Sequence, residues 1–140
     1  MADVIYNSFK QKIMDGSIDL DTDTIKVALV TSAYTPDQDA HDFFNDVTNE
    51  VTGTGYTAGG ATLASKVVSA DNTDNEGVFD AADVTWSTST ITARGAVVYK
   101  STGTSSTSAL ICYIDFGSDK ISSAGDFILQ FNAEGILNLN

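Results

Sequence analysis

Three aspartates near the N-terminus have a spacing that could serve a divalent cation. Asp19, Asp21 and Asp23 are two residues apart, like the first oxygen ligands of a calcium-binding loop. An EF-hand loop that began at Asp19 would need glycine and glutamate where the chain has Thr24 and Val30. The sequence therefore excludes an EF-hand. It predicts no metal and no other cofactor, and it leaves these three aspartates as weak candidates for a looser calcium site.

A second acidic group, Asp71, Asp74 and Glu76, could also collect a cation. Asn and Gly residues lie between these acids, as they do in ordinary solvated turns. Acidic side chains that precede a strand, as Asp19 to Asp23 do, also keep a sheet edge soluble. Both groups are thus explained without a metal.

His41 is the only histidine and the natural candidate for a general base. Asp39 and Asp42 are close to it in sequence, but the chain has no serine in a Gly-x-Ser-x-Gly turn. Cys112, the only cysteine, alternates with Leu110, Ile114 and Phe116 on a predicted strand, which indicates a buried, unreactive thiol. The sequence therefore predicts that the protein is not an enzyme and that it has no catalytic residues.

The elements that position these residues begin with a short helix. Residues 3 to 15 are predicted to be helical because Ile5, Phe9 and Ile13 recur four apart, and Gly16 is a typical C-terminal stop. A helix of this length is marginal on its own. Residues 1–16 are therefore expected to pack against the core of a single 1–140 domain or against a neighbouring subunit.

The rest of the chain has the pattern of short β-strands. Residues 24 to 31, TIKVALVT, are the clearest strand, and seven short β runs follow from residue 50 onward. They are EVTGTGY, ATLASKVVSA, DVTWS, TITARGAVVYK, SALICYIDFG, DFILQFN and GILNLN. The last two, DFILQF and GILNLN, are predicted to form a closing hairpin. Residues 41 to 47 could form a helical turn with Asp42 as N-cap, or a loop. The fold class is therefore predicted to be mainly β, an antiparallel β-sandwich or open barrel with a short N-terminal helix.

Charge limits the partners that such a domain could have. The 140 residues carry a formal net charge of -12, which repels phosphate backbones and anionic lipid headgroups. The sequence therefore predicts no nucleic-acid or membrane binding. The first 16 residues contain polar side chains throughout and no apolar region like that of a signal peptide, so synthesis in a cytosol is expected.

Three blocks of the sequence resemble a known family. They are the run from Ile18 to Lys66, the segment DVTWSTSTITARGAVVYK from Asp83 to Lys100, and LICYIDFGSDK from Leu110 to Lys120 followed by the terminal GILNLN. Together with YNSFKQKIMDGSIDLDTDTIKVALV near the N-terminus, they are similar to small virion structural proteins of tailed bacteriophages. The resemblance spans nearly the whole chain.

The resemblance favours a capsid decoration (cement) protein that binds the outer capsid lattice and stabilises the head. It implies the major capsid protein as partner, a homo-oligomer with a trimer favoured, a location on the capsid exterior and synthesis in the host bacterial cytoplasm. The alternative is a head-fibre or tail component that contacts the host surface through residues 70 to 77 and 101 to 108. A phage-encoded glycan hydrolase, the third hypothesis, would need two facing carboxylates in a cleft.

Six apolar residues are candidates for the interface that a decoration protein needs. Four belong to the predicted helix and two to the turn that follows Pro36. The candidates are Val4, Ile5, Phe9, Ile13, Phe43 and Phe44. Packing in the core of the same chain would explain each of them equally well.

Overall fold

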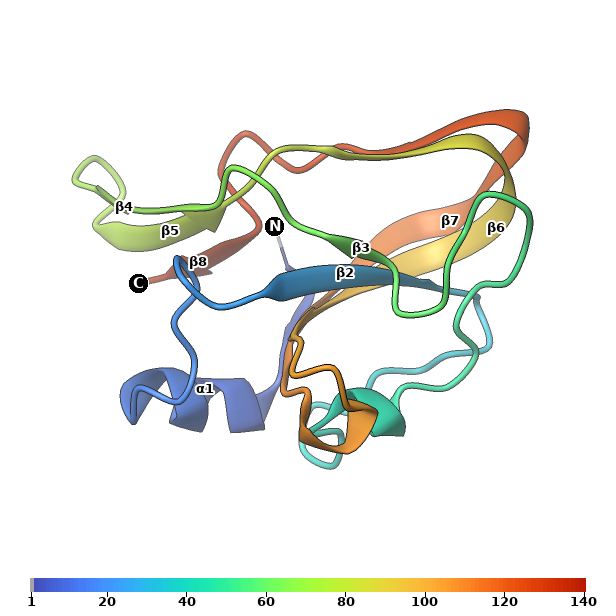
Figure 1. Ribbon diagram of the computed structural model, residues 1–140. Helices are drawn as coiled ribbons and strands as arrows, with labels where there is room; N and C mark the ends of the chain where they lie inside the picture. The colour runs from blue at the N-terminus through green and yellow to red at the C-terminus, as the bar shows by residue number, and fades with distance from the viewer. Residues whose placement is uncertain (1) are drawn as a thin grey trace.

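The computed structural model describes residues 2–140 and is mainly β (Figure 1). All of its strand pairs are antiparallel, and they form two sheets. Within the described residues, α-helix is confined to one short segment near the N-terminus. The arrangement is consistent with a β-sandwich, so the predicted fold class is confirmed.

The larger sheet has five strands in the order β1-β7-β6-β2-β3. Its strand β2, between β6 and β3, is apolar and β-branched, and it is covered on both faces. The bounds are β1 Val4–Ile5, β2 Ile25–Val30, β3 Ala61–Thr62, β6 Val84–Lys100 and β7 Leu110–Leu129.

The smaller sheet contains β4 (Val67–Asp71), β5 (Glu76–Asp80) and β8 (Leu137–Leu139), in that order. The predicted closing hairpin is wrong, because β8 pairs with β5 and not with the end of β7. The end of β7 is already paired with the start of β6, through Val84 and Leu129. The chain therefore crosses to the other sheet before β8.

β6 and β7 form one long ribbon that bends back over the molecule (Figure 1). From the sequence, β6 is predicted as two runs, DVTWS and TITARGAVVYK, and β7 as two others, SALICYIDFG and DFILQFN. The two strands remain continuous through bulges between Trp86 and Ile91, where two buried serines replace lost ladder bonds. The Ser89 and Ser122 hydroxyls lie 2.8 Å apart, and Ser122 Oγ accepts the Ile91 N–H. The bend thus lets one ribbon contribute to both layers.

The N-terminal helix, α1 (Asn7–Met14), is shorter than predicted. Val4 and Ile5 lie instead in β1, paired with Tyr113 and Cys112, because the backbone stays extended through Tyr6. The helix ends where expected, and Gly16 has a φ of 78°. No helix within residues 2–140 is long and apolar enough to span a bilayer.

Two other expected elements differ in detail. The run EVTGTGY is not a strand, because only Glu50 forms an isolated bridge, with Val30. The turn in residues 41 to 47 exists as the 3-10 helix η1 (Phe44–Asp46). Its cap is not the predicted Asp42, since Asp46 Oδ2 accepts the N–H groups of Asp42 and Phe43.

Two apolar clusters lie on opposite faces of the larger sheet. The main cluster lies between the layers and includes Phe9, Leu29, Trp86, Ile111 and Phe127. A second cluster lies on the outer face, beneath the segment between β2 and η1, and it contains four tyrosines. These are Tyr6, Tyr34, Tyr99 and Tyr113. The larger sheet is therefore packed on both sides.

Candidate functional site

Asp19, Asp21 and Asp23 form a hydrogen-bonded turn. Asp19 Oδ1 accepts the backbone N–H groups of Asp21 and Thr22 at 3.1 and 3.2 Å, and the Asp19 N–H donates to Asp23 Oδ2 at 2.8 Å. Asp23 Oδ2 also pairs with Lys100 Nζ at 2.9 Å. Two of the three carboxylates therefore cap their own turn or pair with a lysine. The structure does not gather all three into a set of ligands.

Hydrogen bonds also change the acidity of this turn. The hydrogen bond with Thr22 lowers the pKa of Asp19. Partial burial would raise the pKa of Asp23, but the Asp19 N–H and Lys100 outweigh that effect and lower it. The folded turn therefore stabilises the ionised forms of Asp19 and Asp23.

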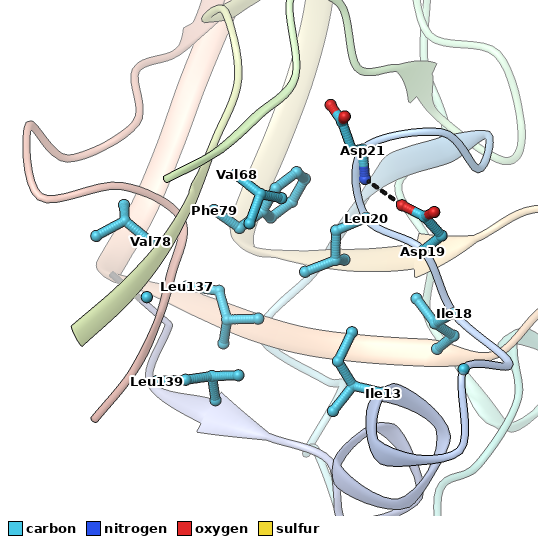
Figure 2. A pocket seen from close by; sticks show the side chains of 12 residues that line it. Ile13, Ile18, Asp19, Leu20, Asp21, Val68, Val78, Phe79, Leu137 and Leu139 are labelled. Carbon is cyan, nitrogen blue, oxygen red and sulfur yellow. Dashed lines mark hydrogen bonds between the residues drawn. The ribbon is translucent and has the colours of Figure 1, made fainter. Parts of the chain in front are cut away.

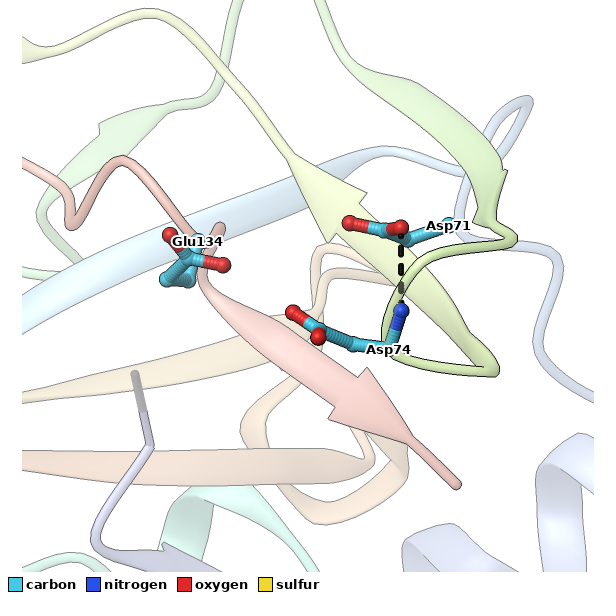
Figure 3. A group of neighbouring side chains, drawn as sticks. All are labelled: Asp71, Asp74 and Glu134. Atoms are coloured by element: carbon cyan, nitrogen blue, oxygen red, sulfur yellow. Dashed lines mark hydrogen bonds between the residues drawn. The ribbon is translucent and has the colours of Figure 1, made fainter.

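The second acidic group contains a different third member from the one that the sequence indicated. Within residues 2–140, the carboxylate oxygens of Asp71, Asp74 and Glu134 lie within 4.8 Å of one another (Figure 3). Glu76 accepts a hydrogen bond from Asn138 Nδ2 instead. Sequence reasoning missed Glu134 because it joins this group only when β8 pairs with β5. Asp71 also caps the hairpin turn, through the N–H groups of Thr73 and Asp74. Such turns are common without an ion.

His41 belongs to a chain of hydrogen bonds that includes Tyr34 and Tyr6. Its Nδ1 accepts the Asp37 N–H at 3.2 Å and bonds to the Tyr34 hydroxyl at 3.0 Å. The Tyr34 hydroxyl in turn lies 2.9 Å from that of Tyr6. Burial raises the pKa of both tyrosines. Among the described residues, no Ser, Thr or Cys side chain hydrogen-bonds to His41.

Cys112 is fully buried, as expected for an unreactive thiol. Burial raises its pKa to about 12, so little thiolate exists near neutral pH. The predicted alternation fails at Leu110, which lies in the outer cluster with Tyr113. A register shift between Val98 and Tyr99 in the β6–β7 ladder reverses the faces at that point.

The six interface candidates have different environments. Phe9 is fully buried in the main cluster, and its position fits the core alternative that the sequence left open. Val4 and Ile5 are half-buried in β1. Phe44 stacks on Tyr99, with ring centroids 4.1 Å apart. Phe43 and Ile13 are also half-buried. The Lys12 ammonium group lies over the Phe43 ring, and Ile13 lines a groove.

That groove has a volume of about 440 Å³. It lies between the smaller sheet and the segment that contains α1 and the residues after it (Figure 2). Its apolar lining includes Ile13, Ile18, Leu20, Val68, Leu137 and Leu139. We call it the α1–β8 groove. Asp19 and Asp21 are its charged lining residues.

The two loops that could contact a host surface are both exposed. Residues 72 to 75 form the tip of the β4–β5 hairpin. The 101 to 108 loop contains the 3-10 helix η2 (Ser105–Thr107) and bonds within itself. Thr102 Oγ1 lies 2.6 Å from Thr107 Oγ1, and Ser108 Oγ donates to the Thr104 carbonyl.

No known family model matches this sequence, and neither a curated protein nor a solved structure is significantly similar to it.

Proposed function

We propose that this protein is a structural component of a tailed-bacteriophage virion, namely a capsid decoration protein that binds the outer capsid and stabilises the head. The observation that carries the proposal is the resemblance of three sequence blocks, which together span most of the chain, to small phage virion proteins. In this proposal the partner is the major capsid protein, and the protein acts as a homo-oligomer, with a trimer favoured.

The chemistry of the described residues is compatible with a binding role. Three titratable side chains that the sequence offered for chemistry have structural roles in the fold. Asp19 caps a turn, His41 bonds to Tyr34, and Cys112 is buried. In this proposal the protein acts by binding partners through its surface.

The exposed apolar side chains supply candidate contacts. Met14 is 87% exposed, and Ile121 and Ile128 on β7 are 72% and 59% exposed. On a repetitive capsid, modest contacts of this kind become effective because each bound copy links neighbouring capsomers. The net charge of -12 would keep the free protein soluble before it assembles.

The first test is the number of copies in each virion. Purified particles of a phage that encodes this chain would be analysed by quantitative mass spectrometry, with the major capsid protein as internal standard. A decoration protein should approach the copy number of the capsid protein. A few copies for each particle would contradict the proposal and favour the head-fibre or tail alternative.

A second test asks whether the protein stabilises heads. Particles from a phage that lacks the gene would be heated with and without added purified protein, and release of DNA would be followed with an intercalating dye. We expect the added protein to raise the temperature of release. Ovalbumin, an unrelated acidic protein, is the control, and an equal effect of ovalbumin would contradict specific reinforcement.

A further inference from the structure

We propose that the α1–β8 groove binds an extended apolar segment of another protein, which adds as a strand to the free edge of β8 and carries Lys or Arg near Asp19 and Asp21. The proposal is argued from the geometry and charge of the groove, and not from the resemblance to phage proteins. It is independent of the decoration role.

The smaller sheet has an open edge at β8. Within residues 2–140, β8 pairs only with β5, so its second edge has no strand partner. Unpaired backbone groups at such an edge can accept a further strand. Leu137 and Leu139, the first and last residues of β8, both line the groove.

The register of the smaller sheet aligns apolar side chains with the groove. Val68, Phe79 and Leu137 lie opposite one another on neighbouring strands, and all three line the groove. Residues opposite one another in a ladder share a face, so a strand added beside β8 would direct alternate side chains into the same groove. Two apolar side chains spaced two apart could then contact Ile13 and Leu20 on the opposite wall.

Gly77, which pairs with Leu139, leaves space on this face of the sheet. A Cβ at Gly77 would meet only Leu139 O, at 3.9 Å, so a side chain could begin here without a close contact. This part of the apolar face is therefore unfilled. Val68 and Leu139 are also 52% and 45% exposed, so the groove is open to solvent.

The charge of the groove lining indicates which kind of segment it could bind. The charged residues that line the groove, Asp19 and Asp21, are exposed and acidic. Nearby lysines are engaged elsewhere: Lys66 donates to the Asp23 carbonyl, and Lys12 lies 4.9 Å from the Phe43 ring centroid. Unlike charges attract across an interface, so the groove favours a basic segment over a second copy of this acidic chain.

The experiment is a selection from a library of random dodecapeptides displayed with free N-termini. We expect the selected peptides to have Val, Ile or Leu at alternating positions, next to Lys or Arg. A synthetic copy of the strongest binder should slow hydrogen exchange at residues 137 to 139 of the full-length protein. Selected peptides without this pattern, or protection only elsewhere, would overturn the proposal.

Matched variants locate the binding. Gly77→Val adds a Cβ that meets no close neighbour and places two methyl groups on the apolar face, so it should weaken peptide binding at least about tenfold, measured by fluorescence anisotropy. Ser69→Val is the control, because Ser69 lies on the opposite face of β4 and the variant should bind like the wild type. Thermal melting would show that both variants fold. If Gly77→Val bound the peptide as tightly as the wild type does, the proposed site would be wrong.

Asp21→Asn tests the charge argument, since no hydrogen bond to the Asp21 carboxylate is present within the described residues. It should weaken the binding of the selected peptide a few-fold and reduce its salt dependence. Sedimentation would also show whether the wild-type protein forms dimers that the Gly77→Val variant does not form. Such dimers would identify a second copy as the occupant and overturn the proposal. None of these measurements uses virions, so this site and the decoration role can fail separately.

Discussion

The two sheets of this protein differ in how completely they are covered. In the larger sheet, five of the six residues of β2 are buried, and only Lys26 is half-buried. In the smaller sheet, four of the five residues of β4 are exposed, and they include Val67 and Val68. The larger sheet can therefore supply most of the stability. The smaller sheet keeps apolar surface that a partner could cover.

The difference has a simple structural cause. The larger sheet is covered by α1 and the bent ribbon on one side and by the segment between β2 and η1 on the other. Within residues 2–140, no comparable segment buries β4, whose residues 67 to 70 are all exposed. The hairpin is held mainly through β5, where Phe79 is buried. A mutation in the larger sheet should therefore destabilise the protein far more than the same mutation in the smaller one.

The largest contrast should come from two glycines. Gly60 has a φ of 75°, and a Cβ there would lie 1.8 Å from Val27 O, so Gly60→Ala should destabilise the fold by about 4 kcal/mol. Gly77→Ala meets no such conflict and should stabilise the strand by about 0.5 kcal/mol. Urea unfolding followed by circular dichroism measures both changes. Similar losses in the two variants would contradict the comparison.

A pair of leucines should give the next largest contrast. Leu29 is fully buried in β2, and Leu29→Ala should lower the free energy of unfolding by about 3 kcal/mol through lost burial and a new cavity. Leu139→Ala should lower the free energy of unfolding by less than about 1 kcal/mol, because Leu139 is 45% exposed. The comparison depends on equal m-values in urea, which show that both variants unfold the same structure.

A smaller effect is expected from the tyrosines on the outer face of the larger sheet. Tyr34→Phe removes the partner of the buried Tyr6 hydroxyl and should cost about 1.5 kcal/mol. Tyr113→Phe is the control, because the Tyr113 hydroxyl makes no hydrogen bond within residues 2–140. That variant should be close to the wild type in thermal melting. Equal losses would show that ring packing, and not the hydroxyl chain, stabilises this face.

Much of the fold follows from local pattern, and the errors arise where distant contacts decide. The strand at residues 24 to 31 was predictable because it is apolar, β-branched and bounded by polar turns. The helix boundary was not, because Ile5 fits a helical repeat but pairs with Cys112 in β1. Tertiary pairing overrides local preference at that position.

The candidate sites show the same limit. The acidic turn at Asp19 was visible in the sequence, but whether its carboxylates converge depends on hydrogen bonds within the folded turn. Glu134 and the α1–β8 groove were not visible, because both depend on β8 pairing with β5. Sequence pattern fixes which face of a strand is apolar. It does not fix which strand lies next to it.

The smallest predicted effect concerns Asp23, whose side chain pairs with Lys100 at one end of the larger sheet. Its pKa is lower in the folded protein than its ordinary value of 3.8. A carboxyl with a lowered folded pKa stabilises the fold above its unfolded pKa, and this stabilisation is lost as the pH falls through the folded value. Wild type should therefore exceed Asp23→Asn by about 0.5 kcal/mol at pH 6, and the difference should shrink below about pH 4. Asp21→Asn is the matched control for general charge effects in urea titrations at each pH. A difference that stayed constant down to pH 3 would assign the effect of Asp23 to its turn geometry and not to its charge.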